Sequence, residues 1–127
     1  MKKIAFAAVV MLSATIAMGQ AKIESWPQMK TFHEVMSQTF HPSENGDLAP
    51  IKKRSAELLE DANKLTSEAL PAAYDNAQIK GAISQLQKEA LALDKMVAVN
   101  VGDDAIKKQL ARVHNAFHQV VGLCRKD

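Results

Sequence analysis

Four stretches of this chain carry apolar residues at alternating three- and four-residue steps, the spacing that lines one face of an α-helix. No stretch shows the sustained period-two alternation, rich in β-branched residues, that a half-buried β-strand needs. The sequence therefore predicts an all-α protein with four amphipathic helices, at residues 25–40, 47–70, 75–99 and 103–124.

Turn and capping residues separate these stretches. Pro42 disfavours helical geometry at His41, so we expect the first helix to end near Phe40. Pro71 ends the second helix, and Gly102 lies between the last two. The expected N-caps are Ser25, Asp47 and one of Asp103 and Asp104, and the third helix is expected to begin at Asp75. Because the connections are short, consecutive helices should be antiparallel neighbours, which gives an up-down-up-down four-helix bundle.

Residues 1–21 have the three parts of a secretory signal peptide. They begin with Lys2 and Lys3, continue with an apolar run over 4–16, and end in small residues up to Ala21. The run is short for a membrane span, and no stop-transfer flank follows it. We therefore expect cleavage and export to a bacterial periplasm, with a retained membrane anchor as the alternative.

The remaining residues, 22–127, are predicted to form one domain. Lys2 and Lys3 are two of 16 basic residues set against 14 acidic ones, so cleavage lowers the net charge from +2 to about zero. Without a basic patch, nucleic acid is not an expected partner, and neither is a membrane after cleavage. The single cysteine, Cys124, excludes an internal disulfide. The expected assembly is a monomer or a homodimer.

Two pairs of donor side chains recur at four-residue spacing on the first and last helices. His114 and His118 form one pair, and Met29 and His33 form the other. If these helices pack antiparallel, Met29 faces the level of His118 and His33, within the apolar stripe, faces the level of His114. Each pair spans about 6 Å along its helix, so the four donors converge within one turn.

Three imidazoles and a thioether are a plausible ligand set for a transition metal ion, zinc or copper. We therefore predict a metal site of His33, His114, His118 and Met29. His41 is expected in a loop at the other end of its helix, bonded to Glu44, and outside the site.

Other chemistry finds little support in the sequence. It contains no Ser or Cys nucleophile with a spaced His and acid, no Gly-rich phosphate loop and no covalent haem motif. No general base with a partner is evident, so we do not expect an enzyme. The alternative to a metal-binding protein is a bundle without a cofactor that has a structural or partner-binding role.

Two short runs are similar to soluble cytochrome b562, a periplasmic four-helix bundle that holds haem b for electron transfer. His114-Asn115-Ala116-Phe117-His118-Gln119 resembles the end of its last helix, and Gln28-Met29-Lys30-Thr31-Phe32 resembles the start of its first. The resemblance implies Met29 and His118 as axial ligands of a haem. The sequence departs from the family at His33 and His114, which add nitrogen donors, so a bare metal ion ranks first and haem second.

Overall fold

The computed structural model describes residues 25–125, so the expected signal peptide lies outside the described residues. Within this range the chain is helical, without β-strands, as the apolar spacing predicted. The elements are α2 (Pro27–Glu44), α3 (Ala49–Ser67), the short 3-10 helix η1 (Ala72–Tyr74), α4 (Ala77–Ala98) and α5 (Asp103–Cys124). None of these helices has the length and apolar content needed to cross a membrane.

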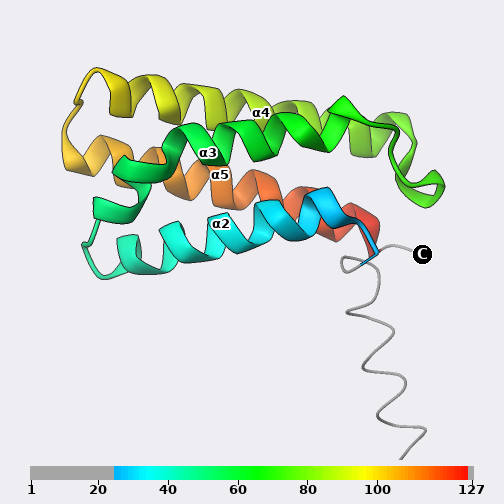
Figure 1. Ribbon diagram of the computed structural model, residues 1–127, viewed down its shortest axis with the longest axis horizontal. Coiled ribbons are helices and arrows are strands. Elements are labelled where there is room, and N and C mark those ends of the chain that lie inside the picture. The colour runs from blue at the N-terminus through cyan, green and yellow to red at the C-terminus, as the bar shows by residue number, and fades with distance from the viewer. Residues whose placement is uncertain (1–24, 126–127) are drawn as a thin grey trace, which may run out of the picture.

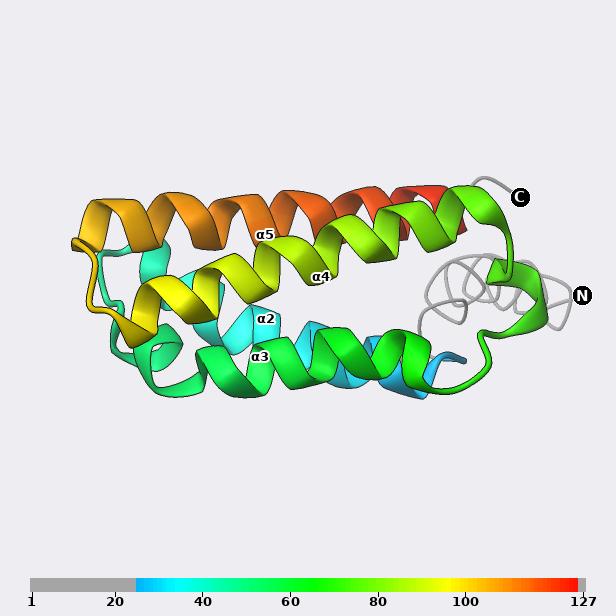
Figure 2. The ribbon, with the colours of Figure 1, turned by 90° about the horizontal axis from the view of Figure 1, so that it is seen from above.

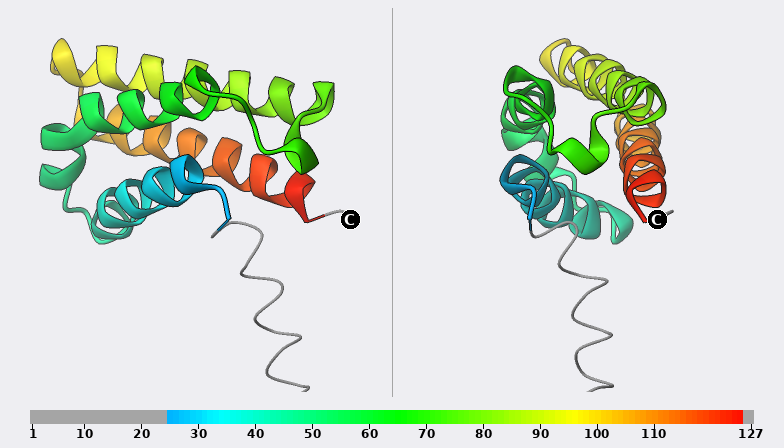
Figure 3. Two further views of the ribbon diagram at one scale, coloured as in Figure 1. Left: turned by 45° about the vertical axis from the view of Figure 1, so that its right-hand side comes forward. Right: turned by 90° about the vertical axis from the view of Figure 1, so that its right-hand side faces the viewer.

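The four α-helices run antiparallel in chain order, which confirms the predicted bundle (Figures 1 and 2). Seen along the bundle axis, they occupy the four corners of one core, so α2 is the neighbour of both α3 and α5 (Figure 3). Of the four neighbouring pairs, α2 and α5 are packed least closely. The segment with η1 lies across one end of the bundle (Figure 3).

The core follows from the apolar stripe of each helix. Phe32, Leu58, Leu86 and Leu110, one from each α-helix, are 0% exposed. Burying such a side chain contributes about 1.5–3 kcal/mol relative to leaving it in water. At one end, the Trp26 ring stacks on Tyr74 of η1 with centroids 5.3 Å apart and closes the core.

The helix starts differ by a residue or two from the expected caps. Trp26, not Ser25, is the N-cap of α2, because Pro27 occupies the first turn and requires an extended residue before it. Asp47 accepts a hydrogen bond from the Ala49 amide at 3.1 Å, as a capping side chain would, although Leu48 is the N-cap of α3. The other N-caps are Asn76 of α4 and Gly102 of α5.

The first helix is longer than predicted, because α2 continues through Pro42 to Glu44. Pro42 lacks an N–H, which leaves one carbonyl of the preceding turn without its helical donor. Two nearby hydroxyls bond other carbonyls of the same helix: Ser43 Oγ donates to the Phe40 carbonyl at 2.6 Å, and Thr39 Oγ1 donates to the Val35 carbonyl at 2.8 Å. His41 is therefore helical, and the expectation that it lies in a loop was wrong.

Candidate metal centre

A surface pocket of about 230 Å³ lies between α2 and α5 and contains all four histidines of the chain. It is lined by His33, Met36, Ser37, Phe40, His41, His114, Phe117 and His118. The α2 residues form a stripe along that helix, and the α5 residues are three and four positions apart, so both helices turn one face toward the pocket.

His114 and His118 are joined in the pocket. Their Nε2 atoms are 3.1 Å apart, and their rings meet edge to face with centroids 4.3 Å apart. Two nitrogens that share a tetrahedral zinc ion, with Zn–N about 2.0–2.1 Å, lie roughly 3.3 Å apart. The two nitrogens therefore lie close to the separation of a chelating pair, at a distance that an N–H···N hydrogen bond between the rings also gives.

Phe40 of α2 fixes one member of this pair. Its ring stacks on His114 with centroids 3.8 Å apart and planes 5° apart, and His114 is partly buried. Burial lowers the pKa of His114 below its ordinary value, and the nearby His118 lowers that pKa further. The lowered pKa favours the neutral imidazole, which is the form that binds metal ions.

His33 is exposed rather than buried within the apolar stripe, which corrects the sequence-based placement. Its ring stacks on Phe117 of α5, with centroids 5.4 Å apart and planes 10° apart. Phe117 in turn packs against Phe32 of the core, with ring centroids 5.6 Å apart. His33 thus covers the outer face of a core aromatic and lines the pocket from α2.

Met29 is not part of the pocket. It is 1% exposed, lies in the core and does not line the histidine pocket. The expected register placed His33 level with His114, but His33 packs on Phe117 and Phe40 packs on His114. The helices are therefore offset from the expected alignment by about three residues at His33 and about seven at Phe40, or about 5 to 10 Å along the axis.

The same offset brings His41 to the pocket, where the sequence did not place it. Its expected bond to Glu44 is present, with Nδ1 3.3 Å from Oε1. Cys124 stays apart: it is buried at the end of α5, which remains helical to that residue.

In the structure as it stands, no group of three or more His, Cys, Asp or Glu side chains within residues 25–125 is close enough to hold a metal ion. The formed part of the site is the pair His114 and His118. The pocket is smaller than the roughly 300–1,000 Å³ typical of sites for drug-sized ligands. Its size and the enclosure of Met29 favour an ion over a haem.

No family model, curated protein or solved structure matches this chain. The resemblance to soluble cytochrome b562 therefore stays a prediction that rests on its two short runs.

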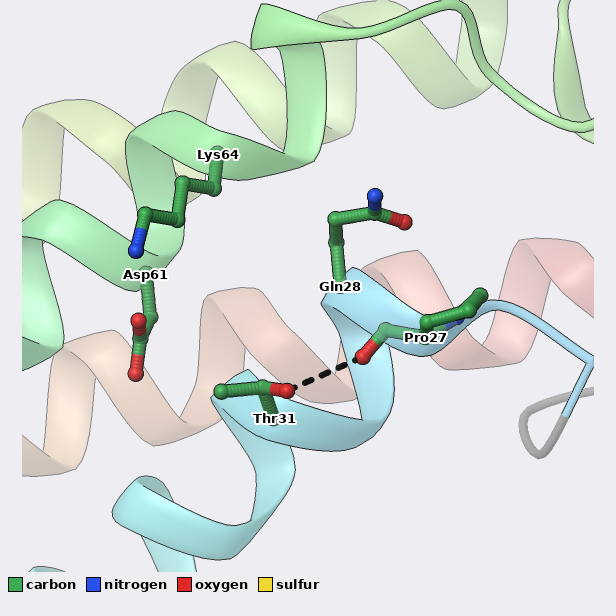
Figure 4. A pocket seen from close by; sticks show the side chains of 5 residues that line it. All are labelled: Pro27, Gln28, Thr31, Asp61 and Lys64. Atoms are coloured by element: carbon green, nitrogen blue, oxygen red, sulfur yellow. Dashed lines mark hydrogen bonds between the residues drawn. The ribbon is translucent and has the colours of Figure 1, made fainter.

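A second pocket, of about 180 Å³, lies between α2 and α3 and contains an unpaired carboxylate. Figure 4 shows Asp61 reaching from α3 toward Thr31 of α2, whose hydroxyl donates to the Pro27 carbonyl. Asp61 is 6% exposed, and its Oδ2 has no hydrogen-bond partner. Burial raises the pKa of Asp61, and the nearby Lys64 opposes part of that rise.

Asp61→Ala is expected to raise the free energy of unfolding by about 1 kcal/mol at neutral pH, because it removes a buried, unsatisfied charge. A raised pKa means that the folded protein binds the proton more tightly than the unfolded chain. The cost of Asp61 is therefore present at neutral pH and is relieved as the pH falls. Urea unfolding at several pH values measures this difference. The extra stability of Asp61→Ala over the wild-type protein should shrink as the pH falls toward 4, near the ordinary aspartate pKa of about 3.9.

Asp94 supplies the matched comparison, because its carboxylate accepts a hydrogen bond from Ser55 Oγ at 2.8 Å. Asp94→Ala should lower the free energy of unfolding by about 1 kcal/mol, since it breaks a partly buried hydrogen bond. Equal effects of the two substitutions would show that the missing partner of Asp61 has no energetic consequence.

Proposed function

We propose that this chain is an exported, non-enzymatic helical bundle that binds one transition metal ion between α2 and α5. His114 and His118 chelate the ion from α5, and His33 contributes a third nitrogen from α2. The signal-like residues 1–21 support export to the periplasm.

The observation that carries the proposal is the 3.1 Å separation of the two Nε2 atoms on one helix. Two histidines four residues apart on a helix offer both nitrogens to one ion at little cost in ordering, since the helix already fixes their backbones. Their rings are also held by neighbours, because Phe40 stacks on His114.

His33 must leave its stack on Phe117 to reach the ion. That stack is worth about 0.5–1.5 kcal/mol, which a metal–nitrogen bond exceeds. His33 is exposed, so its ring turns without opening the core.

An all-nitrogen ligand set selects a late first-row metal. Imidazole suits zinc, copper, nickel and iron, and affinity rises toward Cu²⁺ and falls again at Zn²⁺. The chain should therefore bind Cu²⁺ more tightly than Zn²⁺, and Mg²⁺ and Ca²⁺ very weakly, because these hard ions prefer oxygen ligands.

Titration of the purified mature chain with Cu²⁺ and with Zn²⁺ tests the proposal. We expect one ion per chain in each case, measured by competition with a coloured chelator, and no binding of Mg²⁺. Specific uptake of haem instead, with the absorption bands of a ligated iron, would favour the cytochrome interpretation. Binding of neither haem nor metal would leave a structural or partner-binding bundle.

A further inference from the structure

Within the described residues, Met36 is the only sulfur-bearing side chain that lines the histidine pocket. It is 1% exposed, so it forms part of the buried floor of that pocket. Its thioether is a soft ligand, of the kind that selects Cu(I). Met36 therefore adds to the pocket a donor whose metal preference differs from that of imidazole.

The ring contacts between α2 and α5 determine the level at which Met36 lies. The His33 ring stacks on Phe117 of α5. Further along α2, the Phe40 ring stacks on His114. Met36 lies between His33 and Phe40 on α2, and the two helices are antiparallel. It is therefore level with the space between the two α5 histidines, where their Nε2 atoms come within 3.1 Å.

Three donors are thus present at one level, from the chelating pair of His114 and His118 and from Met36. His33 must leave its stack on Phe117 to supply a further nitrogen, whereas Met36 already lines the pocket. Cu(I) is stable with fewer ligands than the four of a tetrahedral Zn²⁺ site, so these three donors suffice for it.

The charge of the pocket also favours a singly charged ion. Neutral imidazole and thioether groups bring no negative charge to the metal. Within residues 25–125, no acidic side chain lines this pocket. The cost of taking an ion out of water rises steeply with its charge, and neutral ligands compensate this cost less than carboxylates do. Cu(I) therefore enters at a lower cost in desolvation than Cu²⁺ or Zn²⁺.

We propose that the histidine pocket binds Cu(I), with Met36 and the chelating pair as its ligands. The inference rests on the proposed function of this pocket and names the ion that the pocket selects. Zn²⁺ and Cu²⁺ depend on nitrogen from His33, whereas Cu(I) is held by the thioether of Met36 on the pocket floor. The two α2 side chains thus serve different ions at the same α5 pair.

Cu(I) affinity of point variants, measured without oxygen by competition with a coloured Cu(I) chelator, tests the role of Met36. Met36→Leu keeps most of the volume and the apolar character of the side chain, so the bundle should fold. It should weaken Cu(I) binding by at least about tenfold, the lower end of the effect of outer-shell changes, because it removes a ligand itself. Zn²⁺ affinity should stay nearly unchanged, since a thioether is not a usual zinc ligand.

Met29→Leu is the matched control. Met29 also belongs to α2 and is 1% exposed, but it does not line the pocket. Its replacement should leave the affinities for Cu(I) and Zn²⁺ as they are in the wild-type protein. Circular dichroism of the metal-free variants checks that both fold as bundles.

X-ray absorption at the copper edge gives a second measurement that needs no loss of affinity. The Cu(I)-loaded wild-type protein and Met29→Leu should show a sulfur neighbour of the copper, and Met36→Leu should not. Nitrogen neighbours alone in the wild-type protein, or equal Cu(I) affinities of Met36→Leu and the wild-type protein, would overturn the inference. The proposed function survives that result if the wild-type protein still binds Zn²⁺ through the chelating pair; if it binds neither ion, both proposals fall.

Discussion

The double variant His114→Ala/His118→Ala is expected to bind Zn²⁺ at least about 100-fold more weakly than the wild-type protein, or about 2.7 kcal/mol. Both substitutions remove a nitrogen of the chelating pair, whose Nε2 atoms are 3.1 Å apart. Asn115→Ala is the control, since Asn115 is exposed on α5 and does not line the pocket. Competition with a chelator measures both, and equal affinities would show that the pair is only packing.

The pH dependence of the same measurement separates the two candidate cofactors. Histidine must be neutral to bind metal, and its ordinary pKa is about 6.5, so affinity should fall as the pH drops through that region. Burial holds the pKa of His114 below that value, so its contribution should persist to more acid pH. If several histidines bind the ion, more than one proton is released per ion, and the logarithm of the affinity should change by more than one per pH unit. A haem on Met29 and His118 has one histidine ligand, so the same slope should be at most one.

Much of the fold could be predicted from the sequence because burial follows local spacing. In α4, the spacing predicts an apolar stripe of six residues. Five of them, Ile79, Ile83, Leu86, Ala90 and Leu93, are buried, and the last, Val97, is half-buried. A helix with one apolar face has few ways to bury it, and short connections leave antiparallel neighbours as the simplest arrangement. The class of fold therefore depends on features that lie within each helix.

The alignment of α2 against α5 depends on side chains from both helices, and spacing alone does not determine it. Phe40 packs on His114, and Phe117 fits between Phe32 and His33. These aromatic contacts set the offset of α2 against α5, while Met29 lies on the face of α2 that is buried in the core. A sequence argument that counts residues from the helix ends cannot include them.

The site residue that the sequence missed is His41, and the cause lies at Pro42. A proline usually marks a helix end at the residue before it, and that rule alone predicts a loop at His41. The signal for a later end is the Asn45-Gly46 turn, because Gly46 takes the positive φ of 86° that is common just after a helix. A helix end placed at that turn, and not at Pro42, extends the helix to Glu44 and keeps His41 on it.

Phe117→Ala is expected to lower the free energy of unfolding by about 3–5 kcal/mol, the usual cost of removing a buried phenylalanine. The ring is 5% exposed and contacts both the core, through Phe32, and the pocket, through His33. For a domain whose total stability is about 5–15 kcal/mol, this is a large share. Phe117→Leu, which keeps most of the volume, should cost about 1–1.5 kcal/mol, and urea unfolding without metal compares the two.

Metal binding should restore part of the stability that the Phe117 variants lose, because Phe117 is not a metal ligand. An ion that binds only the folded chain stabilises it by about 2.7 kcal/mol at a concentration 100 times its Kd. The Zn²⁺-dependent gain should therefore appear in Phe117→Leu, where the chelating pair remains, and be absent in His114→Ala/His118→Ala. Because His33 stacks on Phe117, loss of that ring frees His33 to turn toward the ion, so Zn²⁺ affinity should fall much less than stability does. A parallel loss of affinity and stability in Phe117→Leu would instead mean that the stacked ring is needed to form the site.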